Sequence, residues 1–236
     1  LLNSDKSKLS KRQGDVDVQS FLEKGYLKEA IINFIALLGW HPNDDKEIFD
    51  INFLIENFTI KKIQKSGAIF DNQKLNWMNS VYIKQLDIKE FILLFNNIYP
   101  KHNYDFSNEQ KNIKVFEFIK NRIKTLDEAD KCLSPFYNNC IIKDQEILDY
   151  IKTQNSSLVL KYWHDSISKT ECIDEIYIKE LIQKTGDQLG FKGKQIFHPL
   201  RAVLYGSFNG PDLFTIISIL GTTEAKKRLE VHIQND

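Results

Sequence analysis

The sequence has few residues that break helices: ten glycines and five prolines occur in 236 residues. β-Sandwiches and barrels need many tight turns, and glycine and proline supply most of these. The abundant residues are lysine, isoleucine, leucine, asparagine and phenylalanine instead. We therefore expect an all-α, mainly helical protein.

Patterns of cysteine and histidine that hold metals are also missing. The three cysteines form no CxxC pair, and the five histidines form no HxxxH or HExxH pair. Disulfide frameworks and zinc sites depend on such spacings. We expect no structural metal in this chain.

The chain lacks both a long apolar run and a net charge. Its most apolar run, Ala30 to Leu38, is interrupted by Asn33, whereas a helix that spans a bilayer needs about 20 apolar residues. We expect a chain that does not cross a membrane. Because 32 basic residues balance 32 acidic ones, any contact with nucleic acid has to come from local basic patches.

The start of the chain shows no signal peptide and no amphipathic presequence. It begins at Leu1, and the single methionine is Met78. Since a translated gene begins with methionine, we expect this chain to be a piece of a longer protein.

The spacing of apolar residues predicts several helices. From Val18 to Leu38 they recur at steps of three and four residues, as on the buried face of a helix. Further helices are expected over Ile88–Tyr99, before Pro100, and over Asn108–Leu126, with Arg122 near the end of the latter.

Capping signals and prolines divide the second half of the chain. Ser168 and Glu171 form an S-x-x-E capping box, which predicts a helix from there to about Leu189. Pro199 and Pro211 are expected in the first turns of helices, where proline is tolerated. Pro135, in the string LSPF, is the best candidate for a domain boundary.

The strongest local chemical signal is the string KLSKR, which covers residues 8–12. Two lysines with a small hydroxyl between them can neutralise the charge that develops on a leaving pyrophosphate. A basic surface loop without a ligand has the same composition, so the pentamer alone leaves both interpretations open.

Four strings in order give the context: LLNSDKSKLSKRQGD, GYLKEAIINFIALLGW, FDNQKLNWMN and FHPLRAVLYGSFNGPDLFTIISILG. Together they resemble bacterial glutamyl-tRNA synthetase, a class I aminoacyl-tRNA synthetase, from its KMSKS-type loop to its C-terminus. The resemblance implies an enzyme that attaches glutamate to tRNA(Glu) with ATP and Mg²⁺, and a cytoplasmic monomer. It also implies three segments: 1–86 for the KMSKS loop and stem-contact helices, and 87–134 and 135–236 for two bundles of an α-helical-cage anticodon-binding domain.

The resemblance assigns roles to particular residues. Lys11 is expected to contact the phosphates of ATP, and the supporting residues of the loop are Lys8, Leu9, Ser10 and Arg12. Arg122 is expected to probe the third anticodon base. The other residues expected on the anticodon side are Arg201, Phe208, Gly210, Pro211, Leu213 and Phe214. Trp77 is expected to be core, and the cluster of Lys61, Lys62 and Lys65 to lie on a helix.

No catalytic residue is expected in this chain. The sequence contains no GxGxxG, no HIGH-like string and no pattern of parallel strands, so the Rossmann half of the enzyme is absent from it. Two alternatives remain: a glutaminyl-type synthetase fragment, which would read the anticodon with β-barrels, and a non-catalytic helical module that binds tRNA. The sequence leaves open whether glutamine tRNAs are also accepted.

Overall fold

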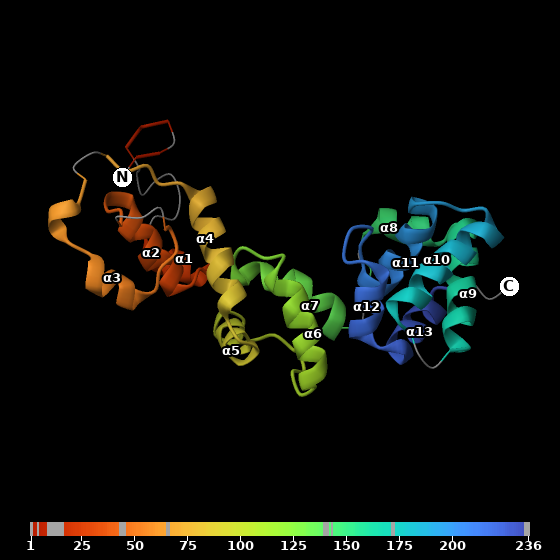
Figure 1. The fold of residues 1–236 in the computed structure, drawn as a ribbon. Coiled ribbons are helices and arrows are strands. Elements are labelled where there is room, and N and C mark those ends of the chain that lie inside the picture. The colour runs from red at the N-terminus through yellow and green to blue at the C-terminus, as the bar shows by residue number, and fades with distance from the viewer. Residues whose placement is uncertain are drawn as a thin grey trace. The chain divides into compact units, whose positions relative to one another are not determined.

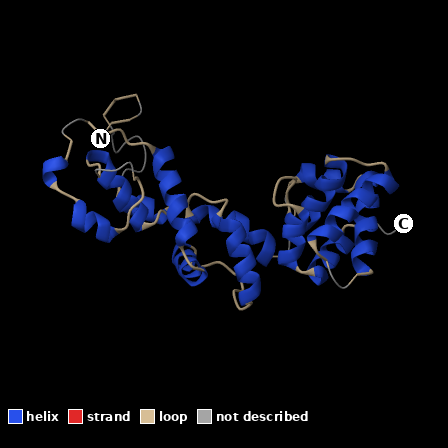
Figure 2. Ribbon diagram, in the orientation of Figure 1, coloured by secondary structure: helices blue, strands red, loops and turns tan. Residues whose placement is uncertain are grey.

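The computed structural model describes residues 2–3, 5–8, 17–42, 46–64, 67–138, 142, 144–170 and 173–233. Helices dominate these residues, as Figure 2 shows, and the only β pairing among them consists of isolated bridges from Leu2 to Lys8 and to Ile69. The all-α expectation is confirmed. The β-barrels that a glutaminyl-type synthetase would place over the second half are absent from the described part of that half.

The contacts between Cα atoms divide the chain into two compact units (Figure 1). Unit 1 contains residues 1–103 and 116–130, and unit 2 contains residues 104–115 and 131–236. This division differs from the three segments expected from the sequence, and those boundaries remain a prediction. No helix in the described ranges is long and apolar enough to cross a membrane.

The described residues of unit 1 form five α-helices and two short 3-10 helices, apart from the two helices that it shares with unit 2. The helices are α1 (Val18–Glu23), α2 (Lys28–Gly39), α3 (Ile51–Asn57), α4 (Asn72–Gln85) and α5 (Ile88–Ile98), with η2 (Ile60–Lys62) and η3 (Leu126–Glu128). Helices α2 and α4 pack against each other. Phe34, Trp40 and Met78 lie in their shared core, each with at most 3% of its surface exposed.

Two helices supply residues to both units: α6 (Glu109–Lys120) and α7 (Ala129–Tyr137). Helix α6 is shorter than the expected 108–126 helix, because the chain turns after Lys120 and Arg122 lies in that turn. Helix α7 runs through Pro135, so no helix ends at LSPF, and the domain boundary expected there remains a prediction. The guanidinium of Arg228 donates to the carbonyl oxygens of Pro135 at 2.7 Å and Asn138 at 3.1 Å, which supplies partners for this end of the helix.

The described residues of unit 2 form six further helices around one core. They are α8 (Gln145–Ile151), α9 (Gln154–Ser168), α10 (Glu175–Leu189), α11 (Lys194–Tyr205), α12 (Leu213–Leu220) and α13 (Thr222–Val231). Helix α9 packs against α10, α11 and α13. At its centre the fully buried Trp163 donates its indole N–H to Thr185 Oγ1 at 2.9 Å, so its polar atom has a partner.

Two sequence expectations fail at helix ends in unit 2. The capping box at Ser168 is wrong, because Ser168 ends α9 and Asp174 caps α10 by accepting from the Tyr177 backbone N–H at 2.7 Å. Pro199 lies in the interior of α11 and not in its first turn. Its side chain is buried in the core, and that packing offsets the helix hydrogen bond that proline cannot make.

Candidate nucleic-acid interface

The candidate surface of unit 2 is built on the end of α11 and on loop 206–212. Gly206 ends α11 with φ of 80°, a left-handed conformation that suits glycine, and its N–H donates to Ala202 O at 2.9 Å. Asp212 begins α12 by accepting from the Thr215 backbone N–H at 2.8 Å. Burial works against ionisation of Asp212, but the hydrogen bonds from Thr215 outweigh it and hold the pKa of that carboxyl below its ordinary value. Both ends of the loop are therefore fixed.

Arg201 is anchored beside this loop. Its Nε donates to the carbonyl oxygen of Pro211 at 3.0 Å, and its guanidinium carbon lies 5.3 Å from the centre of the Phe197 ring. The two terminal guanidinium nitrogens make no hydrogen bond or ion pair within the described residues. An arginine held by one nitrogen can donate from the others to a phosphate or to a base edge.

The ring of Phe208 belongs to a cluster of three rings on the surface of unit 2. It stacks on His198 with centres 4.5 Å apart and planes at 14°, and Tyr150 meets it edge-on at 5.1 Å. All three side chains are partly exposed. The sequence analysis missed Tyr150 and His198, because Tyr150 comes from α8, 58 positions before Phe208 in the chain.

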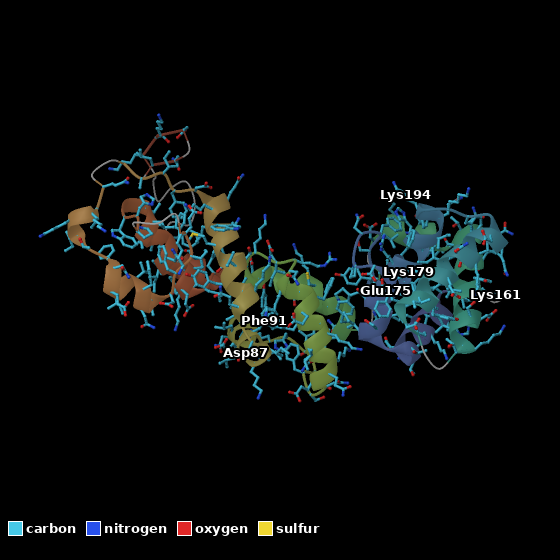
Figure 3. All side chains as sticks on the ribbon, viewed as in Figure 1. Asp87, Phe91, Lys161, Glu175, Lys179 and Lys194 are labelled. Atoms are coloured by element: carbon cyan, nitrogen blue, oxygen red, sulfur yellow. The ribbon has the colours of Figure 1, made fainter. Side chains whose placement is uncertain are left out.

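Basic residues follow the same stripe of α11. Lys194, His198 and Arg201 are spaced by four and three residues, which puts them on one face of the helix. Lys194 is exposed at the start of α11, where Figure 3 labels it. Burial, with smaller effects of Lys194 and Arg201, lowers the pKa of His198 below its ordinary value of 6.5. Neutral pH therefore favours the neutral form of this imidazole.

Gly210 is exposed and lies against the ring of Tyr205. A Cβ atom on residue 210 would come within 2.7 Å of Tyr205 Cδ1, closer than real Cβ contacts allow. A side chain on residue 210 would therefore require the Tyr205 ring or loop 206–212 to shift.

Two of the residues expected on the anticodon side have buried side chains. Leu213 is only 2% exposed and its side chain packs in the core of unit 2, and the side chain of Pro211 is also buried. Their side chains pack in the protein, and their role toward the anticodon remains a prediction. Phe214 is half-buried against the same core.

Arg122 is the candidate residue of unit 1. It is exposed, its backbone N–H donates to Ile119 O at 2.8 Å, and its guanidinium carbon lies 4.4 Å from the centre of the Phe118 ring. Ile123, which follows it, is 2% exposed and fixes the turn in the core. Arg122 is thus presented from a rigid turn, with a guanidinium that makes no hydrogen bond or ion pair to any described residue.

Lys8 is the described member of the KLSKR string. It is exposed, and it pairs with Leu2 across a tight turn in which Asp5 accepts from the Ser7 hydroxyl at 2.6 Å and the Ser7 N–H at 2.9 Å. These hydrogen bonds lower the pKa of Asp5, so the carboxylate stays ionised and holds the turn. Leu9, Ser10, Lys11 and Arg12 lie outside the described residues.

Two further expectations concern residues near α4. Trp77 is 45% exposed on α4, so the expectation that it belongs to the core is wrong. Lys61 and Lys62 are exposed on the 3-10 helix η2, and Lys65 lies outside the described residues. In the described part of the chain, no three His, Cys, Asp or Glu side chains are placed to hold a metal ion.

Two protein families match this chain. Residues 83–233 match the family described as "Anticodon binding domain", and residues 1–77 match "tRNA synthetases class I (E and Q), catalytic domain". The glutamate–tRNA ligase of Carboxydothermus hydrogenoformans is 35% identical over 234 residues, which cover 97% of this chain and 49% of that protein. That of Clostridioides difficile is 31% identical over 244 residues, covering 100% and 49%. The chain thus spans about half the length of the curated relatives it matches.

Solved structures of glutamate–tRNA ligases are also similar to this chain. A glutamate tRNA ligase from Elizabethkingia meningosepticum, crystallised in complex with its amino acid, superposes with a TM-score of 0.81 at 26% identity over 99% of this chain and 50% of that one. A glutamate-tRNA synthetase from Elizabethkingia anophelis gives a TM-score of 0.76 at 27% identity over 100% and 50%. The chain therefore belongs to the family of glutamate–tRNA ligases, which are class I synthetases, and it carries their anticodon binding domain.

Proposed function

We propose that this chain is part of a ligase that attaches glutamate to tRNA(Glu) with ATP, and that its share of the work is to recognise the anticodon. The observation that carries the proposal is the anchored Arg201 beside the ring of Phe208, inside the segment that matches an anticodon binding domain. Among the described residues, this combination of a fixed guanidinium and exposed rings is suited to unstacked bases.

In this proposal the guanidinium of Arg201 and the ring of Phe208 contact different parts of the anticodon. The terminal nitrogens of Arg201 donate to a phosphate or to a base edge, because Nε is already committed to Pro211 O. Phe208, backed by His198, offers a flat apolar surface on which a base splayed out of the anticodon loop stacks. Gly210 lets the loop pass close to Tyr205, and Phe214 adds partly exposed apolar surface.

Arg122 contributes a second contact in this proposal. Its free guanidinium donors suit the edge of a pyrimidine, the role that the family resemblance gives it at the third anticodon base. Stacking on Phe118 limits the side-chain freedom that is lost on binding.

The KLSKR loop supplies contacts to ATP in the complete ligase. Lys11 contacts the phosphates, and Lys8, Ser10 and Arg12 support it, so that ammonium and guanidinium groups offset the charge of the departing pyrophosphate. Magnesium is expected to accompany ATP in the complete ligase. We propose that the whole protein acts in the cytoplasm as a monomer.

We expect that the isolated chain does not form glutamyl-adenylate, because no catalytic residue is expected in it. The readout is glutamate- and ATP-dependent exchange of pyrophosphate by the 236-residue chain. If the chain exchanges pyrophosphate faster than its Lys11→Ala variant does, the expectation that it is inactive alone is wrong.

The test of anticodon recognition is binding to two RNA stem-loops that differ only in the three anticodon nucleotides. Fluorescence anisotropy should show tighter binding to the glutamate anticodon, and the affinity for both should fall as salt rises, since phosphate contacts release counterions. Equal affinity for the two stem-loops would reject anticodon recognition, and affinity that does not change with salt would reject the phosphate contacts.

A further inference from the structure

Acidic residues are missing from one long stretch of unit 2. No aspartate or glutamate occurs from residue 188 to residue 211, although the chain has 32 acidic residues among 236. Every other stretch between two acidic residues is shorter. The same stretch carries Lys192, Lys194 and Arg201, so it gives a local excess of positive charge to a chain that has no net charge.

The lysines of the neighbouring helix α10 differ from Lys194 in having acidic partners. Lys179 Nζ lies 2.7 Å from a carboxylate oxygen of Glu175, and Lys184 Nζ lies 3.2 Å from one of Glu180. The ammonium of Lys194 makes no hydrogen bond or ion pair with any residue that the structure describes. It can therefore neutralise the charge of a bound phosphate without first leaving an ion pair within the protein.

Lys194 lies on the same face of α11 as the ring cluster. His198 follows it after four residues and Arg201 after seven, and both cations act on His198, whose pKa they lower after the larger effect of burial. The Tyr150 hydroxyl donates to the carbonyl oxygen of Lys194 at 3.5 Å, while the Tyr150 ring meets Phe208 edge-on at 5.1 Å. The start of α11 is therefore next to the exposed rings.

Lys194 and Arg201 stand at the two ends of this face. Seven residues of α-helix rise about 10 Å. Because Arg201 Nε donates to Pro211 O at 3.0 Å, the guanidinium stays at its own end. The face thus offers two separate cationic contacts, with His198 and the ring stacked on it between them.

Lys192 adds a second cation at the start of α11. Its backbone N–H donates to Gln195 Oε1 at 3.2 Å, and its carbonyl oxygen accepts from the Gln195 N–H at 3.1 Å, so the backbone before the helix is fixed. The side chain of Lys192 is exposed, and its ammonium also has no partner among the described residues. Two unpaired lysines therefore lie within three residues of each other beside the ring cluster.

We propose that Lys192 and Lys194 bind backbone phosphates of the anticodon loop, next to the nucleotide whose base stacks on Phe208. Every nucleotide of a single strand carries a phosphate, so a base held on Phe208 brings its neighbouring phosphates to the cations beside the ring. These contacts position the loop and do not read its sequence. In naming the anticodon loop as the ligand, the proposal rests on the proposed function.

The test measures, by fluorescence anisotropy, how the affinity of the chain for the two anticodon stem-loops changes with salt. Lys194→Gln should weaken binding of both by the same factor, about three- to tenfold. It should also reduce the steepness of log affinity against log salt by about 0.7, which is the share of one phosphate contact with a single strand. Adding Lys192→Gln should double that reduction. Lys194→Arg keeps the charge and should restore the steepness.

The matched control is Lys179→Gln, which removes the same charge from an exposed lysine of α10 that is paired with Glu175, and should leave the steepness unchanged. No change of steepness in Lys194→Gln, or an equal change in Lys179→Gln, overturns the proposal. If Lys194→Gln alters the preference between the two stem-loops, Lys194 reads a base and the phosphate assignment is wrong. If polyglutamate binds as tightly as the stem-loops and with the same dependence on Lys194, the two lysines hold acidic chains in general, and the assignment to RNA is wrong.

Two results separate this proposal from anticodon recognition. Equal affinity for the two stem-loops, together with reduced steepness in Lys194→Gln, rejects anticodon recognition alone. A preference for the glutamate anticodon, together with unchanged steepness in Lys194→Gln, rejects the phosphate contacts alone. If neither stem-loop binds the unmodified chain, both are wrong. Circular dichroism checks that the variants remain helical.

Discussion

The side-chain amide of Asn79 donates to the carbonyl oxygen of Lys124 at 2.6 Å, while its oxygen accepts from the Leu27 backbone N–H at 2.8 Å. Asn79 is fully buried on α4, so one side chain joins the chain after α1 to the turn that carries Arg122. Gly25 lies at the same junction, where its carbonyl accepts from Leu126 N–H at 3.0 Å.

Asn79→Ala should destabilise unit 1 by about 1–3 kcal/mol, because it leaves the buried Leu27 N–H without a partner and removes the part-buried bond to Lys124 O. The measurement is hydrogen exchange at α2 and α4. Asn121→Ala is the control, since its amide makes only an exposed bond to Glu117 O at 3.2 Å and should cost less than about 0.5 kcal/mol. Equal effects of the two substitutions would show that the junction contributes little.

Gly210→Ala should weaken binding of the glutamate stem-loop while leaving the helices of unit 2 intact. The added Cβ would meet Tyr205 Cδ1 at 2.7 Å, so either the Tyr205 ring or loop 206–212, which holds Arg201 through Pro211 O, has to shift. The measurement is the affinity of each variant for the stem-loop by fluorescence anisotropy. The control is Asn209→Ala, which alters an exposed neighbour and should leave the affinity unchanged. Unchanged affinity for Gly210→Ala would mean that the path of the loop does not matter for RNA.

Acid should destabilise unit 2 partly through His198. Its folded pKa is lowered by burial and then by Lys194 and Arg201, so just below pH 6.5 the unfolded chain binds a proton that the folded chain does not. Stability is therefore retained above this window and falls as the pH drops through it. Burial lowers the pKa of His232 in the same direction, so the two residues share the effect.

The check on His198 is urea unfolding of the unmodified chain and of His198→Gln at about pH 7.5 and about pH 5.5. The variant should lose less stability between the two values. An identical loss in both chains would show that His198 titrates equally in the folded and unfolded states.

Arg122→Gln should reduce discrimination between C and G at the third anticodon position, because glutamine lacks the charged donors of the guanidinium. The comparison uses stem-loops that differ only at that nucleotide. Lys89→Gln, which removes an exposed cation from α5 of the same unit, should leave the preference as it is. If discrimination survives in Arg122→Gln, that arginine does not read this base.

Local signals predicted part of the fold. Helix α5 ends before Pro100 and α10 ends at Leu189, as the sequence predicted. Pro135 and Pro199 lie inside helices, which local signals do not predict. Whether a helix tolerates an interior proline depends on tertiary contacts. Burial of Pro199 and the hydrogen bonds from Arg228 come from residues distant in the sequence.

The sequence likewise predicted only part of the candidate site. The family resemblance of the sequence around Arg201 indicated loop 206–212. It did not indicate which side chains of the loop face outward. Leu213 is turned into the core by the cap at Asp212, whereas the Tyr150 and His198 rings reach Phe208 from other helices. Long-range packing decides such orientations, and a single sequence does not display it.

The most direct test of the account is binding of the glutamate stem-loop and of its shuffled-anticodon partner to Arg201→Gln. The control is Lys179→Gln, which removes an exposed cation from α10 that is paired with Glu175 at 2.7 Å (Figure 3). The account predicts that Arg201→Gln loses about 1–3 kcal/mol, or roughly 5- to 150-fold, for the glutamate anticodon and loses its preference over the shuffled one. Lys179→Gln should keep that preference. An Arg201→Gln chain that still prefers the glutamate anticodon as strongly as the unmodified chain would contradict the account.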